Sequence, residues 1–171
     1  MGSVIIRPEE PADFADVCEV VEDAFGSAAE ARLVDALREL ADDTLSLVAT
    51  QEDRVIGHVF FSPVQVRGPE HNSSAFALAP LAVTPNQQKS GIGQALVRSG
   101  LSQCADLGEF VVFVLGHVDY YPRFGFRPAT PKGLYYRSPG DNPSFMVIEL
   151  ADGALAGRSG EVVYAEPFSE V

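Results

Sequence analysis

The sequence predicts an α/β fold of the α+β type, with a mixed, mostly antiparallel central sheet and helices on both faces. Two observations support this prediction. Apolar residues recur at helical spacing in two segments near the N-terminus, and two strands joined by a tight turn follow them. Further along, an apolar strand, a helix and a second apolar strand succeed one another over residues 78–115, the pattern of two parallel strands joined by a helical crossover.

The N-terminal half of the chain contains a short strand, two helices and a hairpin. Pro8 and Pro11 separate the first strand from the first helix. The spacing of Ser27 and Glu30 is that of a capping box and marks the start of the second helix, whose apolar stripe is formed by Leu33, Leu37 and Leu40. The expected strands cover residues 4–7, 44–50 and 54–66, and the expected helices cover residues 14–25 and 27–40.

The C-terminal third combines loops with short strands. Residues 127–142 are rich in proline, glycine and tyrosine and predict a loop, residues 144–150 predict a final core strand, and residues 161–164 predict an extra edge strand. A chain of 171 residues has the usual size of one domain. We therefore expect a single domain, 1–171, in which residues 151–171 form a C-terminal extension.

The composition excludes several classes of protein. With 24 Asp and Glu against 12 Lys and Arg, the formal net charge is -12, which argues against nucleic acid and against an anionic membrane as partners. No apolar run approaches the ~20 residues that span a bilayer, and the N-terminus lacks the layout of a signal peptide, so we expect a cytoplasmic protein. Cys18 and Cys104 are too few for a disulfide framework or a metal cluster and are expected to be reduced core thiols.

The most informative stretch of the chain joins the strand at residues 78–83 to a helix through a glycine-containing loop. The first amides of a helix have no intrahelical acceptor, and the helix dipole places about half a positive charge there. Gly91 and Gly93 let an anion such as a diphosphate approach these amides, and Lys89 adds a charge. A tight turn before a packed helix would give the same pattern. Leu96 stands where a dinucleotide-binding fingerprint has its third glycine, so that motif is excluded.

Together, several features resemble the GNAT superfamily of acyl-CoA-dependent N-acetyltransferases. They are the strand at 78–83, Gln88-x-x-Gly91-x-Gly93, the strand at 110–115, and Tyr121-x-x-Phe124-Gly125-Phe126. The resemblance is close over residues 78–126, the order of elements agrees to about residue 150, and the last twenty or so residues match only a bacterial-looking subgroup of predicted acetyltransferases. It implies the GNAT fold, in which the two central strands splay apart. Pro80, which cannot donate within a strand ladder, indicates the same break.

The resemblance also implies acetyl-CoA as cosubstrate and no metal. In the family the pantetheine arm lies between the splayed strands, so main-chain groups of Leu81 and Val83 would pair with its amides as in β-augmentation. Core packing alone is the other interpretation of these two residues. The diphosphate would rest on the amides of residues 88–94. The residues implied in cofactor binding are Leu81, Ala82, Val83, Gln88, Lys89, Ser90, Gly91, Ile92, Gly93 and Gln94.

For the chemistry, Tyr121 matches the family tyrosine that protonates the departing CoA thiolate, and Tyr120 is the alternative. A phenol with a pKa of ~10 stays protonated at pH 7 and can protonate a thiolate whose thiol pKa is ~8.5. The strand at 75–80 lacks the glutamate that many members use as base, so His117 is the best candidate, while a water chain or an amine with a lowered pKa stays open. The other two histidines, His58 and His71, are expected to be a core residue with its hydrogen bonds satisfied and a solvated loop residue.

These features predict an N-acetyltransferase that moves the acetyl group from acetyl-CoA to a primary amine by direct attack. The alternative is a non-catalytic acyl-CoA-binding or sensor domain. The acceptor is expected to be a small-molecule or peptide amine, and the acidic balance favours a cationic acceptor over an anionic one, unless the negative charge serves only solubility. A homodimer and the use of other acyl groups stay open.

Overall fold

The computed structural model describes residues 2–40 and 43–171, and the chain divides into two compact units. The first unit comprises the described residues up to Ser62, together with Ala79–Gly100 and Glu166–Val171. The second comprises Pro63–Leu78 and Leu101–Ala165. The expected C-terminal extension is therefore shared between them, and the prediction of a single domain stays a prediction.

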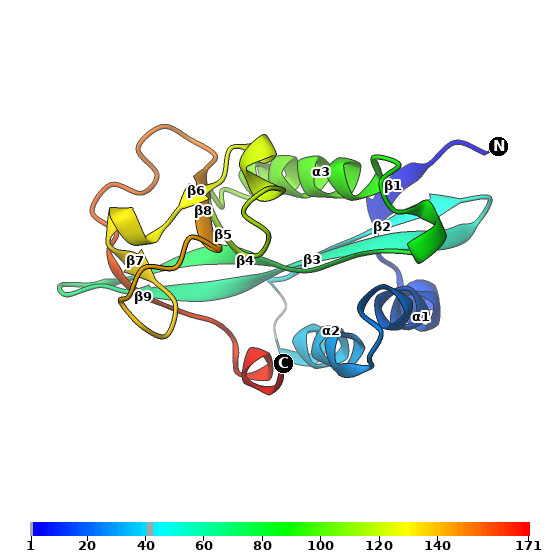
Figure 1. Ribbon diagram of the computed structural model, residues 1–171, viewed down its shortest axis with the longest axis horizontal. Helices are drawn as coiled ribbons and strands as arrows, with labels where there is room; N and C mark the ends of the chain where they lie inside the picture. Colours follow the sequence, from blue (N-terminus) through cyan, green and yellow to red (C-terminus); the bar gives the residue numbers. More distant parts are fainter. Residues whose placement is uncertain (1, 41–42) are drawn as a thin grey trace. The chain divides into compact units, whose positions relative to one another are not determined.

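The first unit contains the predicted N-terminal strands (Figure 1). β1 (Ile5–Pro8) pairs with β2 (Leu45–Gln51), and β2 pairs with β3 (Arg54–Arg67), both antiparallel. Glu52 and Asp53 form the turn between β2 and β3 with φ angles of 51° and 63°, the left-handed conformation that matches the twist of a two-residue hairpin. The hairpin is thus confirmed.

Two helices of the first unit, α1 (Phe14–Phe25) and α2 (Ala29–Leu40), have the predicted positions. The capping box forms only in part, because the Ser27 hydroxyl accepts from the Ala29 amide at 3.4 Å while the Glu30 carboxylate accepts from that hydroxyl and not from a backbone amide. The expected burial of Leu40 is wrong: its side chain, in the last position of α2, is 57% exposed. The buried stripes of the two helices are Val17, Val20 and Val21, and Ala31, Leu33, Val34 and Leu37.

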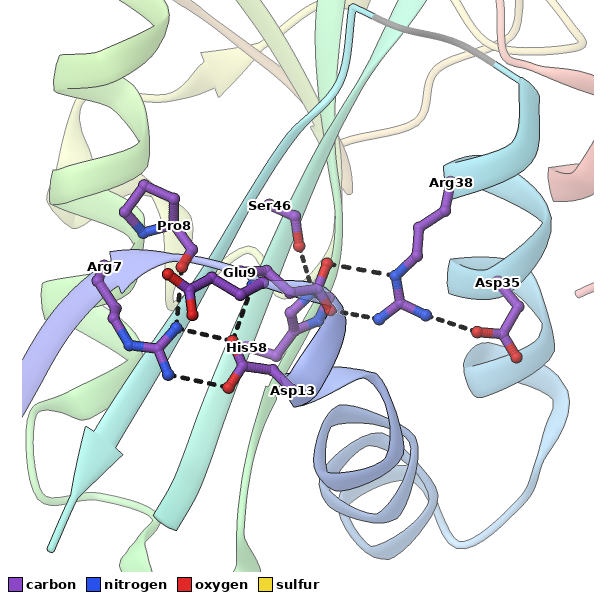
Figure 2. A network of polar contacts seen from close by, with 9 residues as sticks. Arg7, Pro8, Glu9, Asp13, Asp35, Arg38, Ser46 and His58 are labelled. Atoms are coloured by element: carbon purple, nitrogen blue, oxygen red, sulfur yellow. Dashed lines mark hydrogen bonds and ion pairs between the residues drawn. The ribbon is translucent and has the colours of Figure 1, made fainter. Parts of the chain in front are cut away.

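The third helix, α3 (Ile92–Asp106), packs on β3 in the first unit. A Cβ atom at Gly100 would lie 2.2 Å from the Phe61 ring, so only glycine permits this close approach. Gly57 likewise faces Leu96 of α3, and the next residue along β3, His58, points to the opposite face. On that face Arg38 of α2 reaches the polar groups around His58 (Figure 2). The predicted helices on both faces of the sheet are therefore confirmed.

The second unit is built around β5 (Val111–Leu115). β5 pairs in parallel with β4 (Asn72–Val83) and antiparallel with β8 (Phe145–Glu149). β8 also pairs with the two-residue β6 (Arg127–Pro128), and β9 (Gly160–Val163) pairs with β3 and, in parallel, with β7 (Leu134–Tyr135). The strand order is β1-β2-β3-β4 in the first unit and β3-β4-β5-β8-β6 in the second.

Two expectations for the second unit need correction. The segment expected to be a loop contains β6, β7 and the 3-10 turn η4 (Thr130–Lys132) between them. β9 is a strand as predicted, but it has partners on both sides and is not an edge.

The core of the second unit is built from apolar side chains with Tyr164 packed against them, and the rings of Phe113 and Phe145 stack in it with centroids 5.4 Å apart. Its buried members are Val64, Val66, Ala75, Ala77, Val111, Phe113, Ala129, Leu134, Phe145, Val147 and Val162. Of the two cysteines, Cys104 is buried as expected, whereas Cys18 is partly exposed. Within the described residues, no helix is both long and apolar enough to cross a membrane.

Candidate active site

The ladder between β4 and β5 ends where Pro80 predicts a break. Register pairs run from Phe76 and Val112 to Leu78 and Val114. Residues 79–83, the remainder of β4, have no β5 partner in this register. Since Pro80 has no amide hydrogen, it cannot donate a hydrogen bond that would continue the ladder. The main chain of residues 79–83 is therefore not committed to β5.

At its end β4 is tied to the loop that follows. The amide of Thr84 donates to the Ile56 carbonyl at 2.9 Å, which holds the strand exit against β3. The side-chain amide of Gln88 donates to the Val83 carbonyl at 3.0 Å, so the loop folds back on the strand. A carbonyl oxygen has two lone pairs, and one of them on Val83 remains for another donor.

The loop itself turns through two left-handed residues, Lys89 (φ 62°) and Gly91 (φ 91°), after the 3-10 turn η2 (Pro85–Gln87). The Ser90 hydroxyl donates to the Gln87 carbonyl and fixes the turn from within. A Cβ atom at Gly91 would meet no other atom within 4 Å. Glycine is thus required there by the backbone conformation, and the space above it is open.

The start of α3 is rigidly placed beneath this open space. Ile92 is 6% exposed and Leu96 is fully buried, so packing fixes the direction of the helix axis. The amide of Ala95 is the first that finds a helical acceptor, the Gly91 carbonyl at 3.0 Å. In the described part of the chain, the amides of Ile92 to Gln94 have no such partner. With the dipole of α3 behind them and Lys89 exposed beside them, these amides can bind an anion of the size of a diphosphate.

In the second unit, Tyr121 begins the 3-10 helix η3 (Tyr121–Phe124) after β5. Its side chain is only 8% exposed, and its ring makes edge-to-face contacts with Tyr120 at 5.1 Å and with Phe126 at 5.7 Å between centroids. Burial, and to a smaller extent the neighbouring Tyr120, raises the pKa of the Tyr121 hydroxyl well above its ordinary value. The hydroxyl is therefore fully protonated at neutral pH.

A glycine shapes the seat of this ring. A Cβ atom at Gly116 would lie 2.4 Å from Cε2 of Tyr121, so any larger residue would displace the ring. Gly116 is held in turn by its amide, which donates to the Ser144 carbonyl at 3.0 Å. The motif that identified Tyr121 did not include Gly116, although a glycine directly after an apolar strand was a signal that could have found it.

The main chain of His117 belongs to a turn, and its side chain is in contact with solvent. Its carbonyl accepts from the amides of Tyr120 at 3.1 Å and Tyr121 at 3.4 Å, which closes the turn before η3. Its side chain is exposed. The sequence-predicted residues thus form two groups, Leu81–Val83 with residues 88–94 in the first unit, and His117 with Tyr121 in the second.

The other two histidines are placed as expected. His71 is exposed in the turn before β4, where its carbonyl accepts from the Gly68 amide. His58 is fully buried, and its Nε2 lies 2.8 Å from the Ser46 hydroxyl (Figure 2). Burial above all, and then the positive charge of Arg38, lowers its pKa to about 3. The expectation that its hydrogen bonds are satisfied is wrong, because Nδ1 has no hydrogen-bond partner among the described residues. In the same part of the chain, no three His, Cys, Asp or Glu side chains are grouped to hold a metal ion.

Comparison with known proteins agrees with this geometry. A family model described as an acetyltransferase (GNAT) domain matches residues 5–129. The chain belongs to the GNAT acetyltransferase family. It is 41% identical over 167 residues to the uncharacterized N-acetyltransferase YhbS of Escherichia coli strain K12, a match that covers 97% of this chain and 99% of YhbS. It is 34% identical over 163 residues to YjhQ of the same strain, covering 92% of this chain and 90% of YjhQ.

Two solved GNAT structures are similar over almost the whole chain. The crystal structure of YhbS from Escherichia coli in complex with CoA has a TM-score of 0.92 and 40% identity, covering 99% of this chain and 93% of that one. A GNAT acetyltransferase from Brucella melitensis in complex with acetyl-CoA has a TM-score of 0.81 and 33% identity, covering 98% and 99%. The GNAT member described here is accordingly an acyl-CoA-dependent N-acetyltransferase.

Proposed function

We propose that this GNAT protein transfers the acetyl group of acetyl-CoA to a primary amine by direct attack, and that Tyr121 protonates the CoA thiolate. The observation that carries the proposal is the open, amide-lined start of α3 directly after a strand whose ladder with β5 ends at Leu78. The complexes of two similar proteins with CoA and acetyl-CoA support the choice of cosubstrate.

Acetyl-CoA supplies the thioester. The first unit supplies groups that suit the diphosphate of acetyl-CoA and the amides of its pantetheine arm. The amides of residues 88–94 and the Lys89 ammonium suit the diphosphate. The uncommitted main chain of Leu81 and Val83 suits the amides of the arm, in the manner of an added strand.

Tyr121 is suited to protonate a thiolate because its environment keeps the proton on the phenol until negative charge develops nearby. Burial raises the pKa of the phenol, and a thiolate formed in the same apolar surroundings is destabilised for the same reason. The proton transfer therefore stays close to balanced in energy. The amine attacks the thioester carbon, the carbon–sulfur bond breaks, and the phenol proton goes to sulfur.

The amine must lose a proton before or during attack, and His117 is our candidate to receive it. Its exposed ring can exchange that proton with solvent, and a neutral imidazole nitrogen can accept a proton from an attacking amine. Water acting alone, or an amine with a lowered pKa, would make His117 dispensable.

The function is tested by following release of the CoA thiol from acetyl-CoA with a panel of primary amines, and by detecting the acetylated amine by mass spectrometry. Amine-dependent release with a matching product is expected. Binding of acetyl-CoA without turnover on any amine would favour the sensor alternative and contradict the proposal.

A further inference from the structure

The charge of this acidic protein is unevenly distributed along the chain. Residues 120–140 contain four of its 12 Lys and Arg and none of its 24 Asp and Glu. This basic segment, which includes η3, β6, η4 and β7, lies within the second unit and carries Tyr121. Its cations are Arg123, Arg127, Lys132 and Arg137.

These cations are exposed and are not neutralised from within the protein. Arg7 and Arg38 of the first unit both form ion pairs with carboxylates. In the described residues, by contrast, no cation of the basic segment has a carboxylate within ion-pair distance. An exposed arginine without an ion-pair partner remains able to bind an external anion.

Arg123 differs from an ordinary surface arginine because its guanidinium is held in place. Nε donates to the Tyr120 carbonyl at 2.8 Å, and Nη2 donates to the Asp119 carbonyl at 3.3 Å. The guanidinium carbon also lies 4.4 Å from the centre of the Tyr120 ring. A guanidinium has five N–H donors. Those of Nη1 donate to no described residue, so a fixed pair of donors remains available to a ligand.

The same contacts connect Arg123 to the proposed proton donor. Tyr120 contacts the Arg123 guanidinium through its ring face, and its ring meets that of Tyr121 at an interplanar angle of 89°. Two successive side-chain contacts therefore connect the Arg123 guanidinium to the ring that carries the Tyr121 hydroxyl. A ligand group bound by Arg123 would lie near the ring of the proposed proton donor.

In place of the purely cationic acceptor that the overall acidic charge favours, we propose that Arg123 is a specificity residue that binds a carboxylate of the acceptor, so that the acceptor carries both an amine and a carboxylate. This inference rests on the proposed function. The planar fork of arginine matches a carboxylate, and the other cations of the basic segment add long-range attraction for the same charge. The diphosphate of acetyl-CoA has similar chemistry, but residues 88–94 are our proposed site for it, and the ribose 3′-phosphate of CoA is distinguished from an acceptor carboxylate by the KM for acetyl-CoA.

The test uses acceptor pairs that differ only in the carboxylate: lysine with cadaverine, histidine with histamine, and phenylalanine with phenethylamine. Wild type, Arg123→Gln, Arg123→Lys and Arg67→Gln are assayed for kcat and KM. Arg67 is the matched control, an exposed arginine of β3 in the same unit that lies outside the basic segment. Comparing each variant with wild type within one pair cancels the different reactivities of the amines.

Arg123→Gln should lower kcat/KM for the carboxylate member by about tenfold to a hundredfold, the range for a lost hydrogen bond to a charged group. The loss should lie mainly in the acceptor KM. The same variant should leave kcat/KM for the decarboxylated member, and the KM for acetyl-CoA, within about twofold of the wild-type values. Arg123→Lys should recover part of the loss, and Arg67→Gln should show none.

Equal losses for both members of each pair would overturn the proposal, because they would show that Arg123 only supports Tyr120. A rise confined to the KM for acetyl-CoA would also overturn it and assign Arg123 to a CoA phosphate. If no amine is acetylated, the proposed function fails separately. Calorimetric titration of the CoA-bound protein with N-acetylphenylalanine and N-acetylphenethylamine then decides, since equal binding of the two would contradict the carboxylate site.

Discussion

Arg38 of α2 pairs through two nitrogens with the carboxylate of Glu9 (Figure 2), while its guanidinium lies 4.0 Å from the centre of the Phe14 ring of α1. The Glu9 side chain is 4% exposed and that of Arg38 is 13% exposed. One side chain thus joins α2 to α1 and to the segment that follows β1. A buried pair of this kind is sensitive to the loss of one partner, because the other charge is then left uncompensated.

Arg38→Met should therefore lower the free energy of unfolding by about 3–5 kcal/mol, the range for removing one member of a buried pair. Glu9→Gln should cost less, because Arg38 then keeps its ion pair with the exposed Asp35. The double variant should recover much of the loss, because neither charge is then buried alone. Urea unfolding of the four proteins measures these differences, and strictly additive losses would show that the two charges are not coupled.

The buried His58 predicts a specific dependence of stability on pH. A base whose pKa is lower in the folded than in the unfolded protein stabilises the fold above its unfolded pKa, and this contribution is lost as pH falls towards the folded pKa. For His58 the window runs from about 6.5 down to about 3. The charged groups facing it are Glu9, 3.9 Å from Nε2, and Arg38, whose charge opposes protonation.

Unfolding free energy should consequently fall by ~1.4 kcal/mol for each pH unit between about pH 6 and pH 5, since only the unfolded state takes up this proton. The pKa of Asp13 is lowered by its hydrogen bond with Arg7, so the stabilisation from this carboxylate is lost only at lower pH and adds nothing to the slope in this window. His58→Gln should lose the slope in this window, and His71→Gln, at an exposed position, should keep it. A slope that survives in His58→Gln would assign it to other groups.

Gly91→Glu should abolish acetyl-CoA binding, because it places a negative charge in the open space above the start of α3. Its φ of 91° makes any side chain unfavourable, by about 1–2 kcal/mol. Gly91→Ala has the same backbone cost without the charge and is the matched control. We expect both variants to fold and Gly91→Ala to keep measurable binding in a calorimetric titration. Tight binding by Gly91→Glu would show that the phosphate site lies elsewhere.

Tyr121→Phe keeps the buried ring and removes only the hydroxyl, so it should lower kcat by about tenfold to a thousandfold with little change in the KM for acetyl-CoA. Tyr120→Phe should have a smaller effect. Because burial raises the pKa of Tyr121, kcat of the wild type should also show no alkaline loss from this group up to about pH 10. Unchanged turnover in Tyr121→Phe would transfer the role to Tyr120 or to water.

The features that the sequence predicted correctly are those encoded by neighbouring residues. The start of α3 after its glycine-containing loop is one, because a helix start and its glycines are local signals, and the hairpin turn at Glu52 and Asp53 is another. β6 and β7 could not be predicted, since two-residue strands in a proline-rich segment depend on their partners, as Arg127 does on Val147. The ion pair of Glu9 with Arg38 could not be predicted either, because residues 29 apart in the chain meet only once the fold brings them together.

Titration of the purified protein with acetyl-CoA while its thermal unfolding is followed tests the central claim most directly. Ligand that binds only the folded state stabilises it by mass action, by about 2.7 kcal/mol at a concentration of 100 Kd. We predict a melting temperature that rises with acetyl-CoA concentration in the wild type and in Gly91→Ala but not in Gly91→Glu. A melting temperature that stays constant up to millimolar acetyl-CoA in all three proteins would contradict the account.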